Sequence, residues 1–232
     1  MERLALTSED RVLAVVAHPD DMEYGASCAV AKWAEAGIDV AYLLLTRGER
    51  GIAGMDPATT RGVREKEQRA ACDIVGAGEL DLLDFPDGTL TYGLELRKAI
   101  TKRIREFRPT VVLTQNWADV APWGLNQADH RVAGLAAADA ARDAGNEFVF
   151  PEAGGKHQVS QLLVTGHNDP DCGVEVSKRH VDAGAASLDA HEAYFKALPD
   201  HPSGAELVGG AAKQGGEALG CDLAILFKRY QL

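Results

Sequence analysis

The sequence has few cysteines, and none of their spacings is typical of a metal site or a disulfide framework. The four cysteines in the 232 residues are Cys28, Cys72, Cys172 and Cys221, and no two of them form a C-x-x-C pair. We therefore expect neither a zinc ribbon nor a disulfide-rich secreted fold. Because Cys28 and Cys72 fall inside apolar helical patterns, we predict that they are buried structural thiols.

Long hydrophobic runs and an excess of positive charge are also missing. No stretch approaches the roughly 20 apolar residues that span a bilayer, and residues 1–10 contain no apolar core of signal-peptide length. The chain has 24 Lys and Arg against 35 Asp and Glu, a formal net charge of −11. This acidic balance argues against nucleic acid or an anionic membrane as the main partner. We therefore expect a cytoplasmic enzyme without a nucleic-acid or membrane partner.

The length of the chain and the absence of a linker-like segment favour one large domain. A chain of 232 residues can bury a sizeable core without disulfide staples. It contains no internal repeat and no low-complexity linker. We predict a single domain over residues 1–232, and a homo-oligomer is compatible with this sequence.

The most informative stretch is an apolar run that stops at a histidine and two acids. Residues 12–17 read VLAVVA, and the next four, HPDD, supply His18, Asp20 and Asp21. The run predicts a strand buried on both faces, and residues 25–36 predict the helix that follows it. The polar cluster would then lie at the carboxyl end of a strand, the edge where open α/β sheets bind ligands.

Strands and helices alternate over the first two-thirds of the chain. Further strands are predicted at 39–45, 80–85 and 110–114, and helices at 60–75, 94–107 and 129–144. Parallel strands need crossover connections, and such crossovers are right-handed. We therefore predict an α/β fold, a Rossmann-like three-layer sandwich in which a mostly parallel sheet carries helices on both faces.

The last third of the chain is less regular. Short strands are predicted at 162–164 and 223–227, and helices near 181–198 and 205–219. The segment 154–173, dotted with Gly and His, is interpreted as a candidate surface lid.

The turn after the first strand distinguishes nucleotide binding from metal binding. It lacks G-x-G-x-x-G, and two carboxylates would repel a pyrophosphate at the helix N-terminus. His18 and Asp21 supply two of the three N/O ligands that catalytic zinc usually takes. His130 is the best-placed third ligand, because it follows the loop after the strand at 110–114, and that strand commonly neighbours the first one. The simpler alternative is that Asp20 or Asp21 only caps a helix.

Five motifs in combination resemble the LmbE/PIG-L family of zinc-dependent de-N-acetylases. They are AHPDD at 17–21, TRGERG at 46–51, REKE at 64–67, FPDG at 85–88 and DHR at 129–131. The resemblance covers about residues 10–135 and is weak beyond them. Members of that family deacetylate N-acetylglucosaminyl-phosphatidylinositol, N-acetylglucosaminyl conjugates of thiol synthesis and certain glycopeptide antibiotics.

The resemblance implies a role for each matching residue. The implied zinc ligands are His18, Asp21 and His130. Asp20 matches the general base of the family, and Arg64 and Asp87 match residues that contact sugar hydroxyls. An Arg fork and a carboxylate can together recognise neighbouring hydroxyls.

The sequence departs from the family at two places. The usual H-x-D-H reads QADH at 127–130, so that Gln127 replaces a histidine that helps to stabilise the oxyanion. An amide can donate an N–H but no mobile proton. Asp129 is interpreted as a helix cap and as the partner that orients His130. A later H-x-S-Q reads HEAY, which leaves His191 with no assigned role beyond that of a polar residue on a helix face.

These observations predict a hydrolase that depends on zinc, with other divalent metals also compatible. It would remove the N-acetyl group from an N-acetylglucosamine-type sugar or glycoconjugate, with Asp20, Gln127 and Asp129 as its catalytic residues. Two alternatives stay open: an amidase acting on a larger sugar-linked conjugate, and a non-catalytic sugar-binding or regulatory relative. Trp117 and Trp123 are interpreted either as walls of the substrate pocket or as loop anchors.

Overall fold

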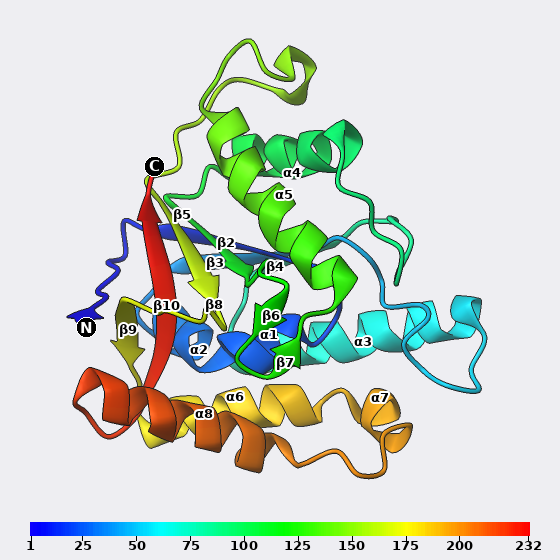
Figure 1. Cartoon of the computed structure of the whole chain (residues 1–232), viewed down its shortest axis with the longest axis vertical. Coiled ribbons are helices and arrows are strands. Elements are labelled where there is room, and N and C mark those ends of the chain that lie inside the picture. Colours follow the sequence, from blue (N-terminus) through cyan, green and yellow to red (C-terminus); the bar gives the residue numbers. More distant parts are fainter.

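The computed structural model describes residues 1–232 and contains an eight-stranded sheet between two layers of helices (Figure 1). The strands of this sheet are β1 (Glu2–Arg3), β2 (Arg11–Val16), β3 (Asp39–Leu44), β4 (Glu79–Leu82), β5 (Val111–Gln115), β8 (Gln161–Thr165), β9 (Cys172–Glu175) and β10 (Ala224–Gln231). A separate hairpin pairs β6 (Val120–Ala121) with β7 (Gly124–Leu125). The helices are α1 (Asp21–Gly25), α2 (Ser27–Glu35), α3 (Pro57–Val75), α4 (Leu94–Phe107), α5 (Ala128–Ala144), α6 (Lys178–Asp189), α7 (Glu192–Lys196) and α8 (Gly204–Leu219), with a 3-10 turn at Pro151–Ala153.

The strand order is β1-β9-β10-β8-β5-β2-β3-β4. Five adjacent strands, β8, β5, β2, β3 and β4, run parallel to one another. Strand β10 runs antiparallel to both of its neighbours, β8 and β9. From β2 the chain builds outward through β3 to β4 and then crosses back to β5 on the other side of β2. The carboxyl ends of β2 and β5 lie at this reversal, the place where open α/β sheets usually bind ligands, because the connections leave the two strands in opposite directions.

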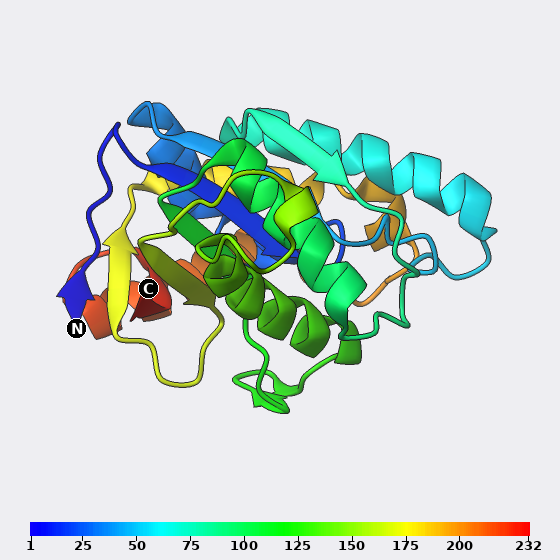
Figure 2. The same ribbon diagram turned by 90° about the horizontal axis from the view of Figure 1, so that it is seen from above.

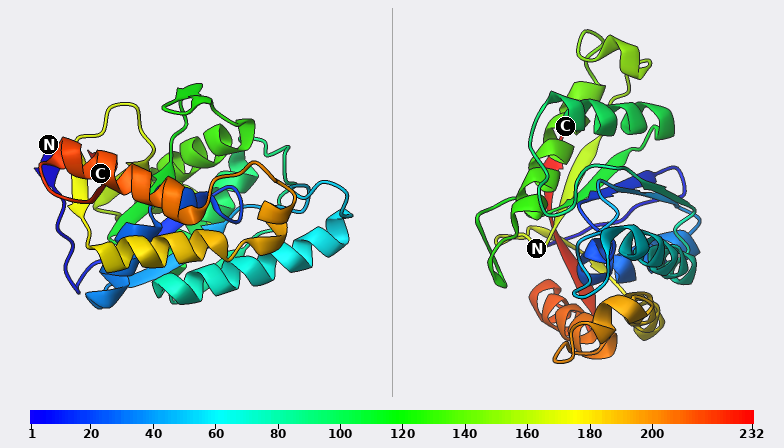
Figure 3. Two further views of the ribbon diagram at one scale, coloured as in Figure 1. Left: turned by 90° about the horizontal axis from the view of Figure 1, so that it is seen from below. Right: turned by 90° about the vertical axis from the view of Figure 1, so that its right-hand side faces the viewer.

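Helices cover both faces of the sheet (Figure 2 and Figure 3). A separate hydrophobic core lies on each face, because side chains alternate along each strand. Val12, Ala14 and Val16 of β2 belong to the core beneath α2, α3, α6 and α8. Leu13 and Val15 belong to the other core, against α4 and α5. The predicted strand buried on both faces is confirmed, as is the three-layer fold.

Most predicted elements are present, with shifted ends. Helix α3 begins three residues before its predicted start, because Asp56 accepts the N–H groups of Ala58 and Thr59 at 3.1 Å and Pro57 suits the first turn. It ends at Gly76, whose φ of 77° is the left-handed conformation of a glycine stop.

Three predictions, two about helices and one about a lid, are corrected. The helices predicted at 25–36 and 181–198 are each interrupted, at Ala26 and near His191, where the backbone leaves the helical region. The interpretation of 154–173 as a lid is wrong, because the segment contains β8, which pairs with β5 and β10 inside the sheet. Its apolar residues 162–164 are buried there.

Cys28 and Cys72 are buried free thiols, as predicted, and Cys172 is a third. Burial raises the pKa of Cys28 and of Cys72 to about 12, so that neither is a reactive thiolate at neutral pH. No helix in the structure is both long enough and apolar enough to cross a membrane.

Leu113→Ala should destabilise the fold strongly, because Leu113 lies in the central strand β5 with no exposed surface. Leu→Ala changes at such positions typically cost about 2–5 kcal/mol, from lost burial and the cavity that remains. Urea unfolding would measure the loss. Leu135→Ala on α5 is the matched control, because Leu135 is 40% exposed and its truncation should shift stability by no more than about 0.5 kcal/mol.

Candidate active site

The predicted ligand residues lie at the carboxyl edge of the sheet, where β2 and β5 end side by side. Val15 of β2 is paired with Thr114 of β5, and the chain leaves β2 directly into the turn that carries His18. The loop after β5 leads to the N-terminus of α5, whose third residue is His130. The predicted ligand residues therefore lie where the strand order reverses, the usual place of a ligand site in an open α/β sheet.

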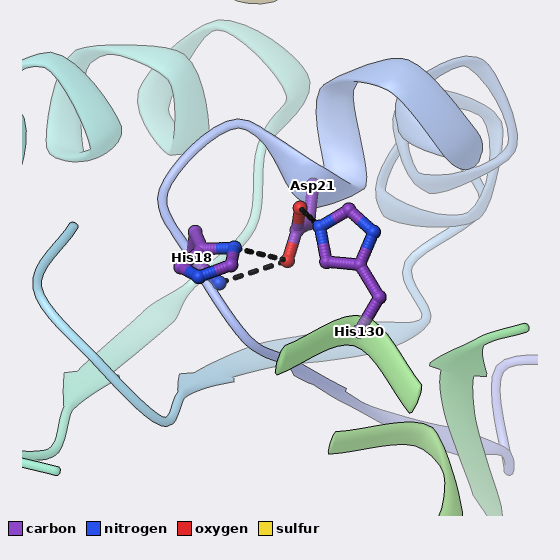
Figure 4. Close-up of side chains that lie close together, drawn as sticks. All are labelled: His18, Asp21 and His130. Carbon is purple, nitrogen blue, oxygen red and sulfur yellow. Dashed lines mark hydrogen bonds and ion pairs between the residues drawn. The ribbon is translucent and has the colours of Figure 1, made fainter. Parts of the chain in front are cut away.

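His18, Asp21 and His130 form one cluster (Figure 4). Nε2 of His130 lies 3.0 Å from Oδ1 of Asp21, and Nδ1 of His18 lies 3.6 Å from Oδ2 of the same carboxylate. One ligand atom from each residue lies within 4.8 Å of the other two. The structure thus brings together the three residues that were predicted from separate parts of the sequence.

The opposite nitrogen of His18 is held by two acids. Nε2 lies 3.1 Å from Oδ1 of Asp87 and 3.2 Å from Oδ2 of Asp129. The Asp129 carboxylate is itself fixed by the N–H groups of Gly88, at 2.7 Å, and Leu90, at 3.0 Å. These acceptors favour the tautomer that carries its proton on Nε2, which leaves the lone pair of Nδ1 directed at the cluster.

The position of Asp129 corrects two predictions. Asp129 was expected to cap α5, but Gln127 is the N-cap residue, and the Asp129 carboxylate accepts the N–H groups of Gly88 and Leu90 instead. Asp129 was also expected to orient His130, but its carboxylate contacts His18. His130 is oriented by Asp21. The difference arises because the loop that carries Asp87 supplies the N–H groups of Gly88 and Leu90. These groups hold the Asp129 carboxylate where it contacts His18.

The donor atoms of the cluster fit a divalent metal ion. Two imidazole nitrogens and one carboxylate oxygen are a ligand set used by open, catalytic sites. A second group, His18 with Asp87 and Asp129, is also compact enough to hold an ion. It fits less well, because both acids already accept backbone N–H groups and face the Nε2 side of the ring.

Asp20 lies beside the cluster and is almost fully buried. Its Oδ2 accepts a hydrogen bond of 2.6 Å from Nη2 of Arg64, whereas Oδ1 makes no hydrogen bond or ion pair within the chain. Burial raises the pKa of Asp20, and the Arg64 cation only partly offsets this. The Asp20 side chain does not cap α1, so the capping alternative is wrong for this residue.

The pKa of Asp21 moves in the other direction. Burial acts to raise it, but His130 and His18 outweigh burial and lower the pKa of Asp21 below its ordinary value. Two adjacent acids therefore have opposite tendencies: Asp21 stays ionised, as a ligand must, and Asp20 more readily takes a proton. Such a split is typical of an acid or base beside a charged partner.

The two residues predicted to contact a sugar are more enclosed than expected. Arg64 is 2% exposed, and its guanidinium lies 4.2 Å from the centre of the Tyr194 ring. Asp87 is 5% exposed and accepts the N–H of Arg50 at 2.7 Å. Contact of either residue with substrate stays a prediction.

Gln127 precedes the first residue of α5, and its side chain is exposed. Its amide forms no capping hydrogen bond with the helix. Contact of Gln127 with substrate stays a prediction.

Sequence reasoning missed a set of buried polar residues behind Asp20. They are Glu23, Gln68 and His191. His191 is fully buried just before α7, so its interpretation as a polar residue on a helix face is wrong. Gln68 lies one turn after Arg64 on α3, a spacing that places both side chains on one face of that helix and could have signalled a shared role.

The two tryptophans have different environments. Trp117 packs against Gly134 of α5 and lies 6.0 Å from the Tyr230 ring, as a loop anchor would. Trp123 is 60% exposed at the tip of the β6–β7 hairpin, beside Gly166.

Comparisons with known proteins identify the family to which the chain belongs. The family model described as "PIG-L: GlcNAc-PI de-N-acetylase" matches residues 13–141. A diacetylchitobiose deacetylase of Thermococcus kodakarensis is 38% identical over 142 residues, which cover 58% of this chain and 50% of that protein. A probable N-acetyl-alpha-D-glucosaminyl L-malate deacetylase 2 of Bacillus anthracis is 32% identical, over 58% of this chain and 61% of its own length. The chain thus matches only about half to three-fifths of the length of these relatives.

A solved structure shares the fold over nearly the whole chain. The N,N'-diacetylchitobiose deacetylase of Pyrococcus horikoshii superposes with a TM-score of 0.86 and 20% identity, covering 96% of this chain and 84% of its own. At that identity the likeness shows the fold alone. The family match is the stronger finding, because it covers more than half of the chain and contains every residue of the metal-capable cluster. The chain belongs to the PIG-L family of de-N-acetylases.

Proposed function

We propose that this protein is a zinc-dependent hydrolase that removes the N-acetyl group from an N-acetylglucosamine-type sugar or glycoconjugate. The observation that carries the proposal is the cluster of His18, Asp21 and His130, with Asp20 beside it. The names of the two relatives, both deacetylases of N-acetylated sugars, support the substrate class.

The ligand residues would hold one zinc ion between the two imidazoles and the carboxylate. The chemistry that the ion supplies when bound is polarisation of the amide carbonyl and a lowered pKa of a water molecule. Asp87 and Asp129 keep the Nδ1 lone pair of His18 directed at the cluster.

Asp20 would move the proton. Its Oδ1 is free of other partners and can take a proton from the attacking water as the new C–O bond forms. When the C–N bond breaks, the same carboxyl returns that proton to the departing nitrogen. The products are acetate and a free amine. Arg64 holds the other oxygen of Asp20 throughout and keeps the charged form paired.

A panel assay tests the proposal. Purified protein, stripped of metal and reloaded with zinc, is incubated with N-acetylglucosamine, N,N'-diacetylchitobiose and N-acetylglucosaminides of inositol and malate, and released acetate is measured. We expect zinc-dependent acetate release from at least one of these compounds. Cleavage only of longer acyl groups would make the protein an amidase. Binding of sugar without any hydrolysis would make it a non-catalytic relative.

Gln127→Ala should lower kcat while leaving KM nearly unchanged, if the amide donates to the oxyanion that develops during hydrolysis. Loss of one such donor typically costs about 10²–10³-fold in rate. Steady-state kinetics on the best substrate of the panel would measure both constants.

Gln127→His is the companion to this test. An imidazole would add a group that titrates near neutral pH to the rate profile. Normal turnover in Gln127→Ala would remove Gln127 from the mechanism and point to a backbone N–H as the donor.

A further inference from the structure

Asp20 has an unusual backbone conformation for a residue with a side chain. Its φ of 86° lies in the left-handed region, and only two other non-glycine residues of the chain, Arg108 and Phe150, share a positive φ. Asp tolerates this region better than most residues, but the conformation persists only where its surroundings hold it. The groups that hold Asp20 therefore determine where its carboxylate points.

Two side chains of α3 provide that hold. Arg64 donates from Nη2 to Oδ2 of Asp20 and to the carbonyl of Pro19, both at 2.6 Å. Gln68 lies one turn later and accepts the backbone N–H of Asp20 at its Oε1, at 2.9 Å. The Asp20 amide is thus fixed from one face of the same helix that fixes the carboxylate.

Glu23 sets the orientation of the Gln68 amide. Its Nε2 donates to Oε1 of Glu23 at 3.2 Å, which leaves Oε1 of Gln68 directed at Asp20. Glu23 has no exposed side-chain surface, and its second oxygen lies 3.6 Å from Nε2 of the equally buried His191. Burial of an acid and an amide is costly unless hydrogen bonds satisfy them. The contacts of Gln68 with Asp20 and Glu23 supply such bonds, whereas the second oxygen of Glu23 has none. Gln68, Glu23 and His191 are not members of the metal-capable cluster.

We propose that Gln68, oriented by Glu23, is a positioning residue that holds Asp20 in its left-handed conformation and so directs the free Oδ1 at the reacting water. The proposal rests on the proposed function, in which Asp20 is the base. Gln68 acts only through Asp20 and does not touch the donor atoms of the cluster.

Gln68→Met tests the proposal, because Met fills a similar volume and offers only a weakly accepting thioether in place of the amide oxygen that accepts the Asp20 N–H. We expect kcat to fall about 10- to 100-fold, the usual cost of losing a group that supports a reacting residue. KM and the zinc content should stay at the wild-type values. Steady-state kinetics and metal analysis on the same preparation would measure all three. Unchanged kcat would overturn the proposal, and loss of zinc would show that Gln68 supports the ligand turn instead.

A second measurement does not depend on activity. Hydrogen exchange of the Asp20 amide, followed by NMR, should be faster in Gln68→Met than in the wild type, because the amide loses its acceptor. If the wild type releases no acetate from any compound, the proposed function fails, and this exchange rate alone decides whether Gln68 holds Asp20. An unchanged exchange rate would overturn the proposal.

Two further comparisons exclude a general loss of stability. Val75→Ala truncates a buried residue two turns farther along α3, and it should destabilise the protein without changing kcat. Glu23→Gln keeps an oxygen that can accept from Gln68, whereas Glu23→Leu removes it. Glu23→Gln should therefore retain more of the wild-type kcat than Glu23→Leu, and equal losses in the two variants would contradict the role given to Glu23.

Discussion

Asp20→Asn is expected to lower kcat by about 10²–10⁴-fold, the usual worth of general acid–base catalysis. Asn has nearly the same shape as Asp and tolerates the left-handed backbone that Asp20 adopts, with φ 86°. It cannot take a proton from water at its amide. Zinc should stay bound at the wild-type stoichiometry, because Asp20 makes no contact with the ligand atoms and is instead paired with Arg64.

The measurement pairs kinetics with metal analysis. Asp143→Asn is a matched control, because Asp143 also forms a close ion pair with an arginine, Arg97, at 2.8 Å, but does so near the end of α5 that is distant from the cluster. It should lower stability and leave kcat unchanged. Full activity in Asp20→Asn would remove Asp20 from the role of base, and loss of zinc would make it a ligand.

The placement of the candidate site could be predicted because each residue of the metal-capable cluster lies in the connection after a recognisable strand. Residues 12–17 predict β2 from apolar pattern alone, and the polar turn after them must lie at its carboxyl end. The pairing of β2 with β5 then brings His130 close to His18. Sequence pattern was sufficient here because sheet geometry fixes which loops meet.

The hydrogen-bond partners of Asp129 and His130 could not be predicted in the same way. Asp129 and His130 are adjacent in sequence, and yet their side chains lie on different sides of the cluster and contact different partners. The choice depends on the Gly88 and Leu90 amides, and so on the exact path of the loop after β4. No local pattern encodes that path, because loop geometry depends on packing.

The buried polar residues Glu23, Gln68 and His191 could not be predicted from the sequence for a related reason. Glu23 and Gln68 come from different helices, and each alone resembles an ordinary polar residue on a helix surface. Only the folded chain brings the Gln68 side chain within hydrogen-bond distance of Glu23 and of the Asp20 amide. His191 comes from a third segment, which the sequence predicted as the interior of one long helix.

His130→Ala is expected to remove most of the bound zinc. It deletes one of three donors, and the remaining two, on His18 and Asp21, hold a divalent ion far less well. Removal of a group that merely supports a ligand typically costs about 10- to 100-fold in metal affinity, and removal of a ligand should cost more. Metal analysis after dialysis would detect the loss, and competition with a chromophoric chelator would give the change in affinity.

The control for this variant is another histidine with a structural contact outside the site. Nε2 of His157 lies 2.6 Å from the carbonyl of Pro109, and His157→Ala should keep the full zinc content. Stoichiometric zinc in His130→Ala would contradict the assignment of His130 and shift attention to the alternative group of His18, Asp87 and Asp129. Asp129→Asn distinguishes the two sets: it should weaken zinc binding by no more than about 10- to 100-fold if Asp129 only orients His18, and by more than that if the carboxylate is a ligand.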